Sequence, residues 1–198
     1  MIELLTERLR LHPLDLDDLD DLWRLDSDES VMRYVGSGPV ADQAAHRERM
    51  QELVVRFADS PFGLWGIRKL ENDTFYGIAL LIPFEDSPDI EIGYRLLPEA
   101  WGQGVATEAG RALIRYGFEA LRLGRIVGVT HPDNAASRRV LTKLGLAYRG
   151  TRAQYGQDVA YYVADRGVAD ATGEAKPAGS EVDKTVELSV APTVGRHG

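Results

Sequence analysis

The sequence contains no cysteine among its 198 residues. Disulfide bonds, thiolate zinc sites and a cysteine nucleophile are therefore excluded. No apolar run approaches the roughly 20 residues that a membrane-spanning helix requires. The first residues, MIELLTERLRL, carry charge where a signal peptide would be apolar. We therefore expect a cytoplasmic protein without a membrane partner.

An excess of positive charge is also lacking. Lys and Arg number 23 against 31 Asp and Glu, which gives a formal net charge of -8. This balance argues against nucleic acid as a partner, because a surface that binds it would be basic. The four histidines share no spacing typical of metal ligands, so we expect no metal. The acidic balance favours solubility and is compatible with a cationic partner such as an amine.

The remaining composition, 44% hydrophobic and 27% charged, is typical of a soluble globular protein. Periodicity predicts the order β-α-α-β-β-β-α-β-α-β-β, which favours one α/β (α+β) domain with a central mixed sheet. We expect strands at 8–13, 89–96 and 126–130, a hairpin formed by the two runs that flank residues 71–73, and a final pair of strands after residue 145. We expect helices at 15–25, 41–58, 107–121 and 134–144. His46 lies among charged neighbours, and we interpret it as a surface residue.

The last part of the chain differs in character. Residues 166–198 contain no aromatic side chain and are rich in small and charged residues. Such a segment has little to pack, which predicts a flexible, low-complexity tail. Only TVELSV, at 185–190, alternates as a strand would.

The stretch LLPEAWGQGVATEAG (96–110) passes from a strand to a helix through Gly102, Gly104 and the small Ala106. A helix start leaves four N–H groups unpaired and carries positive charge. Small residues let an anion approach, so the loop predicts a phosphate cradle, with a tight connection that binds nothing as the alternative. A P-loop pattern is missing, and Thr107 stands where a dinucleotide pattern needs its third glycine.

Three stretches together resemble the GNAT superfamily of acetyl-CoA-dependent N-acetyltransferases, most closely its ribosomal-protein (RimJ/RimL-type) branch. They are TERLRLHPL (6–14), IEIGYRLLPEAWGQGVATEA (90–109) and NAASRRVLTKLG (134–145). The resemblance covers about residues 4–165. It implies a GNAT domain over 1–165, with a twisted mixed sheet whose fourth and fifth strands splay apart.

The same resemblance implies acetyl-CoA as co-substrate and assigns its contacts. The backbone N–H groups of Trp101–Thr107 receive the pyrophosphate, and the pantetheine arm pairs with the strand end at Tyr94–Leu97. The implied binding residues are Tyr94, Leu96, Trp101, Gly102, Gln103, Gly104, Val105, Ala106, Thr107, Asn134 and Ser137.

Acetyl transfer requires a base, because an α-amino group has a pKa of about 7.7–8.0 and a lysine about 10.4. The resemblance places a glutamate at Glu91, facing the acceptor, although alternation with Ile90 and Ile92 also fits a surface carboxylate. We expect a backbone N–H near Ile92 or Tyr94 to serve the oxyanion, and we consider Gly93 as the position of a β-bulge that turns this N–H inward.

Asn134 opens the later helix as an N-cap, and by the resemblance it also contacts coenzyme A or substrate. Many superfamily members carry an acid tyrosine seven residues further on, where this chain has Leu141. In this branch a serine at Ser137 is assigned to the leaving thiolate, although its hydroxyl could equally bond its own helix backbone. Arg138 and Arg139 either meet the 3′-phosphate or are exposed. Other candidate acids are Tyr148, Tyr155, Tyr161 and Tyr162.

The sequence thus predicts an enzyme that moves acetyl from acetyl-CoA to a primary amine by direct attack in a ternary complex. The acceptor would be a protein N-terminus or a small-molecule amine, with helix 41–58 forming one wall of its site. A non-catalytic acyl-CoA-binding or sensing module is the alternative, and it would keep the cradle without needing a base. A nucleotide-binding domain of another fold is a weaker third reading. We also consider a homodimer formed through edge strands near the C-terminus.

Overall fold

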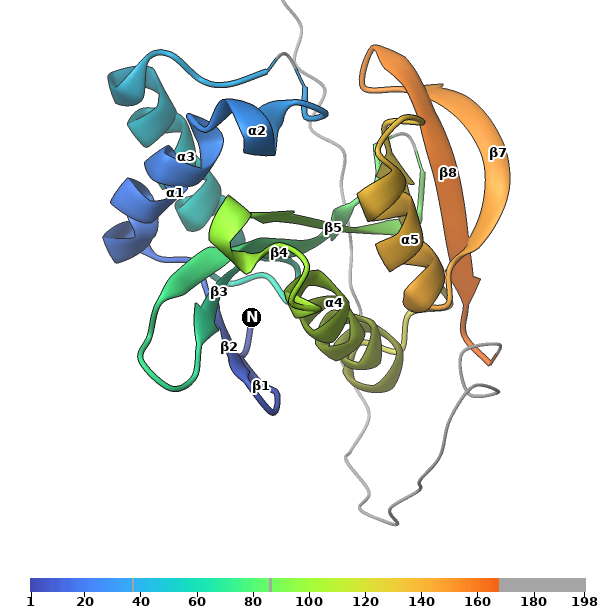
Figure 1. The fold of residues 1–198 in the computed structure, drawn as a ribbon. Helices are drawn as coiled ribbons and strands as arrows, with labels where there is room; N and C mark the ends of the chain where they lie inside the picture. Colours follow the sequence, from blue (N-terminus) through green and yellow to red (C-terminus); the bar gives the residue numbers. More distant parts are fainter. Residues whose placement is uncertain (37, 86, 168–198) are drawn as a thin grey trace, which may run out of the picture.

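The computed structural model describes residues 1–36, 38–85 and 87–167, which form an eight-stranded mixed sheet with flanking helices (Figure 1). The sheet order is β1-β2-β3-β4-β5-β6-β8-β7. The strands are β1 (Leu4–Leu5), β2 (Leu9–Pro13), β3 (Gly63–Lys69), β4 (Phe75–Pro83), β5 (Ile90–Leu96), β6 (Arg125–Thr130), β7 (Ala147–Gln154) and β8 (Gln157–Asp165). Neighbouring strands are antiparallel except β5 and β6, which are parallel. The predicted fold class is confirmed.

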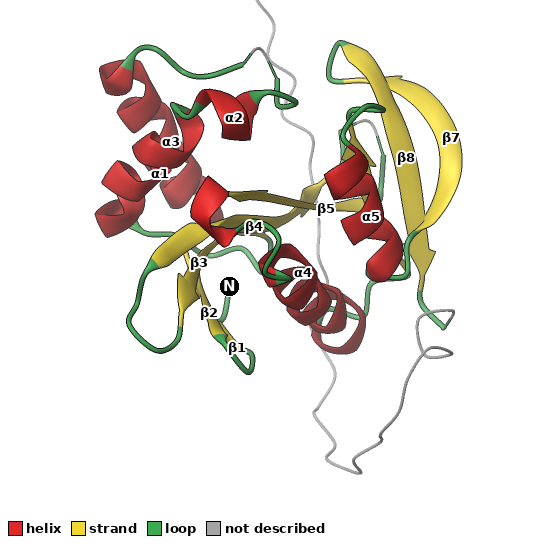
Figure 2. Cartoon of the chain, in the orientation of Figure 1, coloured by secondary structure: helices red, strands yellow, loops and turns green. Residues whose placement is uncertain are grey.

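Five α-helices lie in the described ranges, and Figure 2 shows α1–α3 grouped together, away from the β7–β8 pair. They are α1 (Leu19–Asp26), α2 (Glu29–Met32), α3 (Gln43–Phe57), α4 (Val105–Arg115) and α5 (Ala135–Lys143). The helix predicted over 107–121 is α4, which starts two residues earlier and passes into a π-helical turn at Tyr116–Ala120. The short β1 and α2 went unpredicted, since neither is long enough to show a period.

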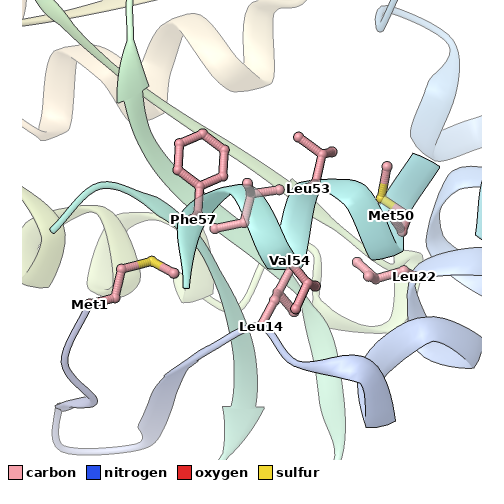
Figure 3. Close-up of a pocket in the computed structure, with 8 residues that line it drawn as sticks. Met1, Leu14, Leu22, Met50, Leu53, Val54 and Phe57 are labelled. Atoms are coloured by element: carbon pink, nitrogen blue, oxygen red, sulfur yellow. The ribbon is translucent and has the colours of Figure 1, made fainter. Parts of the chain in front are cut away.

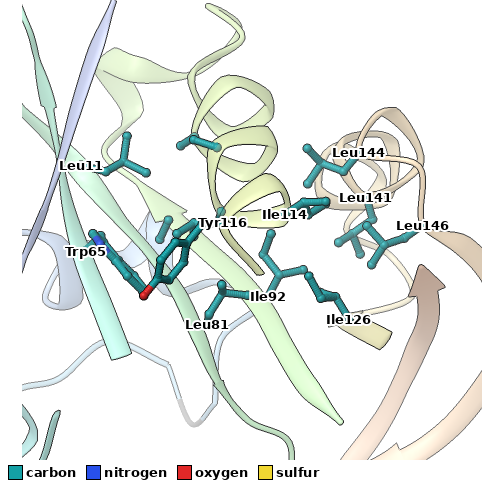
Figure 4. Packing of buried hydrophobic residues seen from close by; sticks show 14 of the residues in the cluster. Leu11, Trp65, Leu81, Ile92, Ile114, Tyr116, Ile126, Leu141, Leu144 and Leu146 are labelled. Atoms are coloured by element: carbon teal, nitrogen blue, oxygen red, sulfur yellow. The ribbon is translucent and has the colours of Figure 1, made fainter. Parts of the chain in front are cut away.

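Two large hydrophobic cores lie on the two faces of the sheet, and a third, smaller cluster holds Phe84, Val127 and Val163. Successive strand residues point to opposite faces, so β4 contributes Ile78 to the core beneath α1 and α3, and Ala79 and Leu81 to the core beneath α4. Figure 4 shows the second core, where Ile92 of β5 and Ile126 of β6 pack below α4 and α5. This packing holds α4 and α5 against the two strands that diverge.

Gly110 of α4 and Gly117 of the π-helical turn that follows allow close packing, although only Gly117 faces the sheet. A Cβ at Gly117 would lie 2.8 Å from Ile126 Cδ1 of β6. A Cβ at Gly110 would lie 2.6 Å from Leu144 Cδ1, just after α5. Gly110 therefore brings α4 against α5, and this contact is what sequence alone could not assign.

His46 is not the surface residue that its charged neighbours suggested. It is 2% exposed, and its Nε2 lies 3.0 Å from Asp26 Oδ2. Positions 46, 50 and 57 share one helical face, and His46, Met50 and Phe57 are the buried residues of α3. Asp26 also pairs with Arg95 Nη2 at 3.2 Å. The cluster therefore fastens α1 and α3 to β5.

Helix α3 covers its part of the sheet through apolar contacts. Figure 3 shows Met50, Val54 and Phe57 of α3 around a small pocket that Leu14 and Leu22 also line. Every side chain that lines this pocket is apolar. The pocket therefore offers no polar group for binding or catalysis.

The strand considered at 185–190, and most of the predicted tail, lie outside the described residues.

Candidate active site

Strands β5 and β6 pair over only two positions, Ile90 with Ile126 and Glu91 with Val127. Beyond these positions β5 continues to residue 96 and β6 to residue 130. In the described ranges the two strands make no further pairs with each other. We call this divergence the splay. It is the separation of adjacent parallel strands that the resemblance implied. Counting the short β1, the two strands are the fifth and sixth of the sheet.

The main chain of β5 alternates between the neighbouring strand β4 and the splay. Leu97 N–H bonds Tyr76 O of β4 at 2.9 Å, whereas Leu96 C=O points away and accepts the Trp101 indole N–H at 2.7 Å. Because this direction repeats every second residue, the main-chain groups of Ile92 and Tyr94 also face the splay. This is where the sequence predicted an N–H donor.

The predicted β-bulge at Gly93 is wrong. The ladder between β4 and β5 runs without interruption, and Gly93 stands opposite Leu80. A Cβ at this position would lie 3.0 Å from Leu80 Cδ1. Gly93 therefore leaves room for the Leu80 side chain. The regular alternation of the strand is enough to direct the N–H groups of Ile92 and Tyr94 toward the splay.

The loop after β5 has the form of an anion cradle. Gly102 and Gly104 have φ of +72° and +79°, in the left-handed region that favours glycine. Gly104 is the N-cap of α4, and no side chain caps the helix start. The N–H groups of Gly102–Thr107 donate no hydrogen bond to any described residue. A Cβ at Gly102 would meet nothing within 4 Å, so the loop is open on that side.

Arg8 borders this loop, and the sequence analysis did not single it out. Its Nη2 donates to Gln103 O at 3.1 Å, and its Nε donates to Glu108 Oε2 at 2.8 Å. Glu108 Oε1 also accepts from the Thr6 hydroxyl at 2.6 Å. The first two stretches of the resemblance therefore meet in space. A single sequence gives no signal for a contact between residues 100 positions apart.

The side chains of two predicted binding residues brace the loop. Trp101, which is 48% exposed, is tied to Leu96 O by its indole N–H, and the Gln103 amide donates to Glu99 O. Val105 is buried and Ala106 packs against the core. What the loop presents to a ligand is therefore its backbone.

Glu91 is buried, with an exposed fraction of 7%. Its neighbours Ile90 and Ile92 belong to the core beneath α4, so Glu91 points to the other face of the sheet. Burial raises the pKa of the Glu91 carboxyl to about 7, and the hydrogen bond that Oε2 accepts from the Tyr155 hydroxyl opposes this rise. Glu91 is thus no surface carboxylate, and it is poised to exchange a proton near neutral pH.

Asn134 and Ser137 form the start of α5, across the splay from β5. Asn134 Oδ1 accepts from Ser137 N–H at 3.0 Å, which is the predicted N-cap. The Tyr94 hydroxyl of β5 donates to Ser137 O at 3.0 Å and lies 3.2 Å from Ser137 Oγ. Burial raises the pKa of Tyr94 above its ordinary value. Tyr94 therefore links the two diverging halves as a neutral phenol.

Of the four tyrosines considered as acids, only Tyr155 contacts Glu91. Tyr162 accepts from Arg138 Nε at 3.1 Å, and the Tyr148 hydroxyl lies 3.3 Å from Thr151 Oγ1 of its own strand. Beside α5, an open pocket collects basic side chains around Tyr162. It is lined by Ala135, Arg138, Arg139, Thr142, Lys143 and Tyr162.

Two further properties concern the described ranges as a whole. No helix within them has the length and apolar character to cross a bilayer. No group of three or more histidine and acidic side chains within them is arranged to hold a metal ion.

Residues 8–147 match the family model of the acetyltransferase (GNAT) domain. The chain is similar to an uncharacterized N-acetyltransferase, p20, of Bacillus licheniformis, with 32% identity over 78% of this chain and 88% of the relative. It is 26% identical to the spermidine N(1)-acetyltransferase of Escherichia coli strain K12, over 72% of this chain and 74% of the relative.

Among solved structures, the chain is similar to RimL, a ribosomal L7/L12 alpha-N-protein acetyltransferase in complex with coenzyme A. The TM-score is 0.71 with 20% identity, over 82% of this chain and 97% of the other. At that identity the likeness concerns the fold.

Proposed function

The chain belongs to the GNAT acetyltransferase family, and from that premise we propose that it transfers an acetyl group from acetyl-CoA to a primary amine. One observation carries the proposal: a helix start without a cap, at Gly104, follows the same strand that carries the buried Glu91. An anion-binding loop and a proton acceptor are thereby joined in one strand–loop–helix unit. We propose residues 1–165 as the acetyltransferase domain.

The unpaired N–H groups of Gly102–Thr107 fit the pyrophosphate of coenzyme A. They lie at the positive end of α4, and the open side at Gly102 leaves room for a phosphate. Asn134 and the main chain of Tyr94 and Leu96, on the two sides of the splay, would complete the binding residues. When bound, acetyl-CoA supplies the activated acetyl group as a thioester.

Glu91 is proposed as the base that takes the proton of the acceptor amine, directly or through water. Its pKa of about 7 is close to the value of about 7.7–8.0 for an α-amino group, so the proton transfer is nearly balanced. An N–H of Ile92 or Tyr94 is proposed to stabilise the negative charge that develops on the carbonyl oxygen. Ser137, whose hydroxyl lies beside that of Tyr94, is proposed to donate a hydrogen bond to the leaving thiolate.

Two acceptor classes follow from the similarities. The fold likeness to RimL favours a protein N-terminus and supports the RimJ/RimL-type branch, whereas the relative in Escherichia coli acts on spermidine. A screen with acetyl-CoA should include N-terminal peptides, polyamines and aminoglycosides, with release of free thiol as the signal. We expect at least one class to be acetylated.

The alternative is a module that binds acyl-CoA without catalysis, and Glu91→Gln separates the two. We expect this variant to lose roughly 10²- to 10⁴-fold in turnover, as is typical when a general base is removed. Its affinity for coenzyme A, measured by calorimetry, should stay that of the wild type. Glu119→Gln, at an exposed position of the π-helical turn, is the matched control. A wild type that binds acetyl-CoA but acetylates nothing in the screen would support the binding module instead.

A further inference from the structure

The turn between β7 and β8 holds a tyrosine where the backbone favours other residues. Gln154 pairs with Gln157, so Tyr155 and Gly156 alone form the turn. Their φ values are +53° and +74°. Turns of two residues with both φ positive usually carry Asn-Gly or Asp-Gly. A bulky residue in the left-handed region is strained, and such strain points to a function for the side chain.

The Tyr155 side chain reaches the candidate base from the other half of the sheet. Its hydroxyl donates to Glu91 Oε2, 64 positions away in the sequence. The ring packs edge-on against Phe84, with 6.2 Å between ring centroids. Although Tyr155 as a whole is 47% exposed, its hydroxyl meets a carboxylate that is 7% exposed. The hairpin that belongs to one half of the sheet thus supports a group on the other half.

The second oxygen of Glu91 is left open. No described residue donates a hydrogen bond to Oε1. In the described ranges, the fully enclosed side-chain atoms that make no hydrogen bond are His12 Nδ1 and Asp26 Oδ1, and Asp26 Oδ1 lies in the ion pair with Arg95. Glu91 Oε1 is not among these atoms, so it retains contact with solvent. One oxygen is therefore held by Tyr155 and the other is free to meet a water molecule or an amine.

We infer that Tyr155 is the positioning residue of this site: its hydroxyl fixes the Glu91 carboxylate by Oε2 so that Oε1 faces the acceptor. The inference rests on the proposed function, because it assigns Glu91 as the base. Tyr155 lies in the β7–β8 turn, where its left-handed backbone conformation is unfavourable for a tyrosine.

The hydrogen bond is the one polar contact that acts on Glu91 in the described part of the chain. The strand neighbours of Glu91 are the apolar Ile82 of β4 and Val127 of β6. Burial raises the pKa of Tyr155, and Glu91 and the charge of Glu85, which lies between β4 and β5, raise it further. Arg152 of β7 lies over the rings of Phe84 and Tyr161, 5.1 and 5.0 Å from their centroids. Without the hydroxyl, burial would act on Glu91 unopposed and its pKa would rise.

The first test compares Tyr155→Phe with Tyr76→Phe, which also removes one hydroxyl, from a tyrosine of β4 that has no part in the proposed site. We expect Tyr155→Phe to lower kcat/KM for the amine roughly tenfold near pH 7, with the KM for acetyl-CoA unchanged. The acid limb of its pH profile should move to higher pH, because the carboxylate loses a donor. Tyr76→Phe should match the wild type in both measurements. Superimposable pH profiles of Tyr155→Phe and wild type would overturn the inference.

A second variant separates positioning from folding. Tyr155→Asn puts a residue that tolerates the left-handed region into the turn. We expect a melting temperature equal to or above that of the wild type, together with an activity loss like that of Tyr155→Phe. Retention of full activity in this stable variant would also contradict the inference.

The third measurement does not depend on acetyl transfer. The Glu91 carboxyl carbon can be titrated by ¹³C NMR in wild type, Tyr155→Phe and Tyr76→Phe, with Glu91→Gln for assignment. A higher pKa of Glu91 in Tyr155→Phe alone supports the contact even if no acceptor is found, in which case only the proposed function fails. An unchanged pKa in an active enzyme overturns the role of Tyr155 and leaves the proposed function intact.

Discussion

At the scale of single residues, two buried carboxylates show opposite responses to their surroundings. Burial raises the pKa of Glu91 to about 7, and one hydroxyl opposes it. Burial also acts to raise the pKa of Asp18, but hydrogen bonds from His12 and Arg68 outweigh it and bring the value to about 2. Asp18 is therefore a stabilising anion, whereas the ionised form of Glu91 costs stability.

The raised pKa of Glu91 leads to a prediction for the stability of Glu91→Gln. The carboxyl has a pKa of about 7 in the fold and 4.5 as the reference value, so the folded state holds a proton that the unfolded state has lost. The stability due to that proton is complete below pH 4.5 and disappears as pH rises through 7. The loss amounts to roughly 2–4 kcal/mol.

We therefore expect the stability gain of Glu91→Gln over wild type to be larger at pH 8.5 than at pH 5. Urea unfolding at both pH values measures it, with Glu119→Gln as the exposed control. An equal difference at the two pH values would contradict the assigned burial of Glu91. Together with the activity loss, the result would show a site in which function opposes stability.

At the scale of elements, the loop from β5 to α4 depends on supports from elsewhere in the chain. Its left-handed glycines open the helix start, and Arg8 with Glu108 fastens it to the N-terminal strand region. The Trp101 indole closes the loop onto the end of β5. The backbone amides are thus arranged before any ligand arrives, which reduces the ordering needed on binding.

Gly102→Ala tests this loop, and Gly145→Ala is its match. Gly145 has φ of +84° after α5, and a Cβ at either glycine would meet nothing within 4 Å. Both variants should therefore lose a similar stability of about 1–2 kcal/mol from backbone strain alone. Calorimetry should show weaker coenzyme A binding in Gly102→Ala only. Equal affinities in the two variants would argue against the cradle.

At the scale of the whole molecule, a short pairing of β5 with β6 joins two halves of the sheet. Side-chain contacts between the halves include Tyr94 with Ser137, Tyr155 with Glu91, and Tyr34 with His131, whose rings lie 5.2 Å apart. A ligand that binds both α4 and α5 would join the same two halves.

Coenzyme A is therefore expected to raise the melting temperature of the whole domain. At a ligand concentration of about 100 times the dissociation constant, the gain is about 2.7 kcal/mol. Melting temperatures measured with coenzyme A, ATP and NAD distinguish a coenzyme A-binding domain from a nucleotide-binding one. Gly102→Ala should reduce the rise in melting temperature that coenzyme A causes. A larger shift with NAD or ATP than with coenzyme A would favour a nucleotide-binding domain instead.

Much of this architecture could be predicted from the sequence because it depends on local patterns. Periodicity located the long strands and helices, and the glycine loop was visible as G-x-G before a helix. The resemblance to the GNAT superfamily, though not to its RimJ/RimL-type branch, is confirmed. The roles of Glu91, Ser137 and the loop residues stay predictions, since a contact in the fold does not test a reaction.

The sequence by itself determined where the backbone turns, which faces are apolar and where a helix begins without a cap. Only the tertiary structure decided which distant residues meet: Arg8 beside the loop, His46 on Asp26, and Tyr155 on Glu91. The physical reason is that local propensities act within a few residues along the chain. Burial and charge pairing arise only when separate strands and helices pack, so the environment that brings a carboxylate to a pKa of about 7 is a property of the assembled fold.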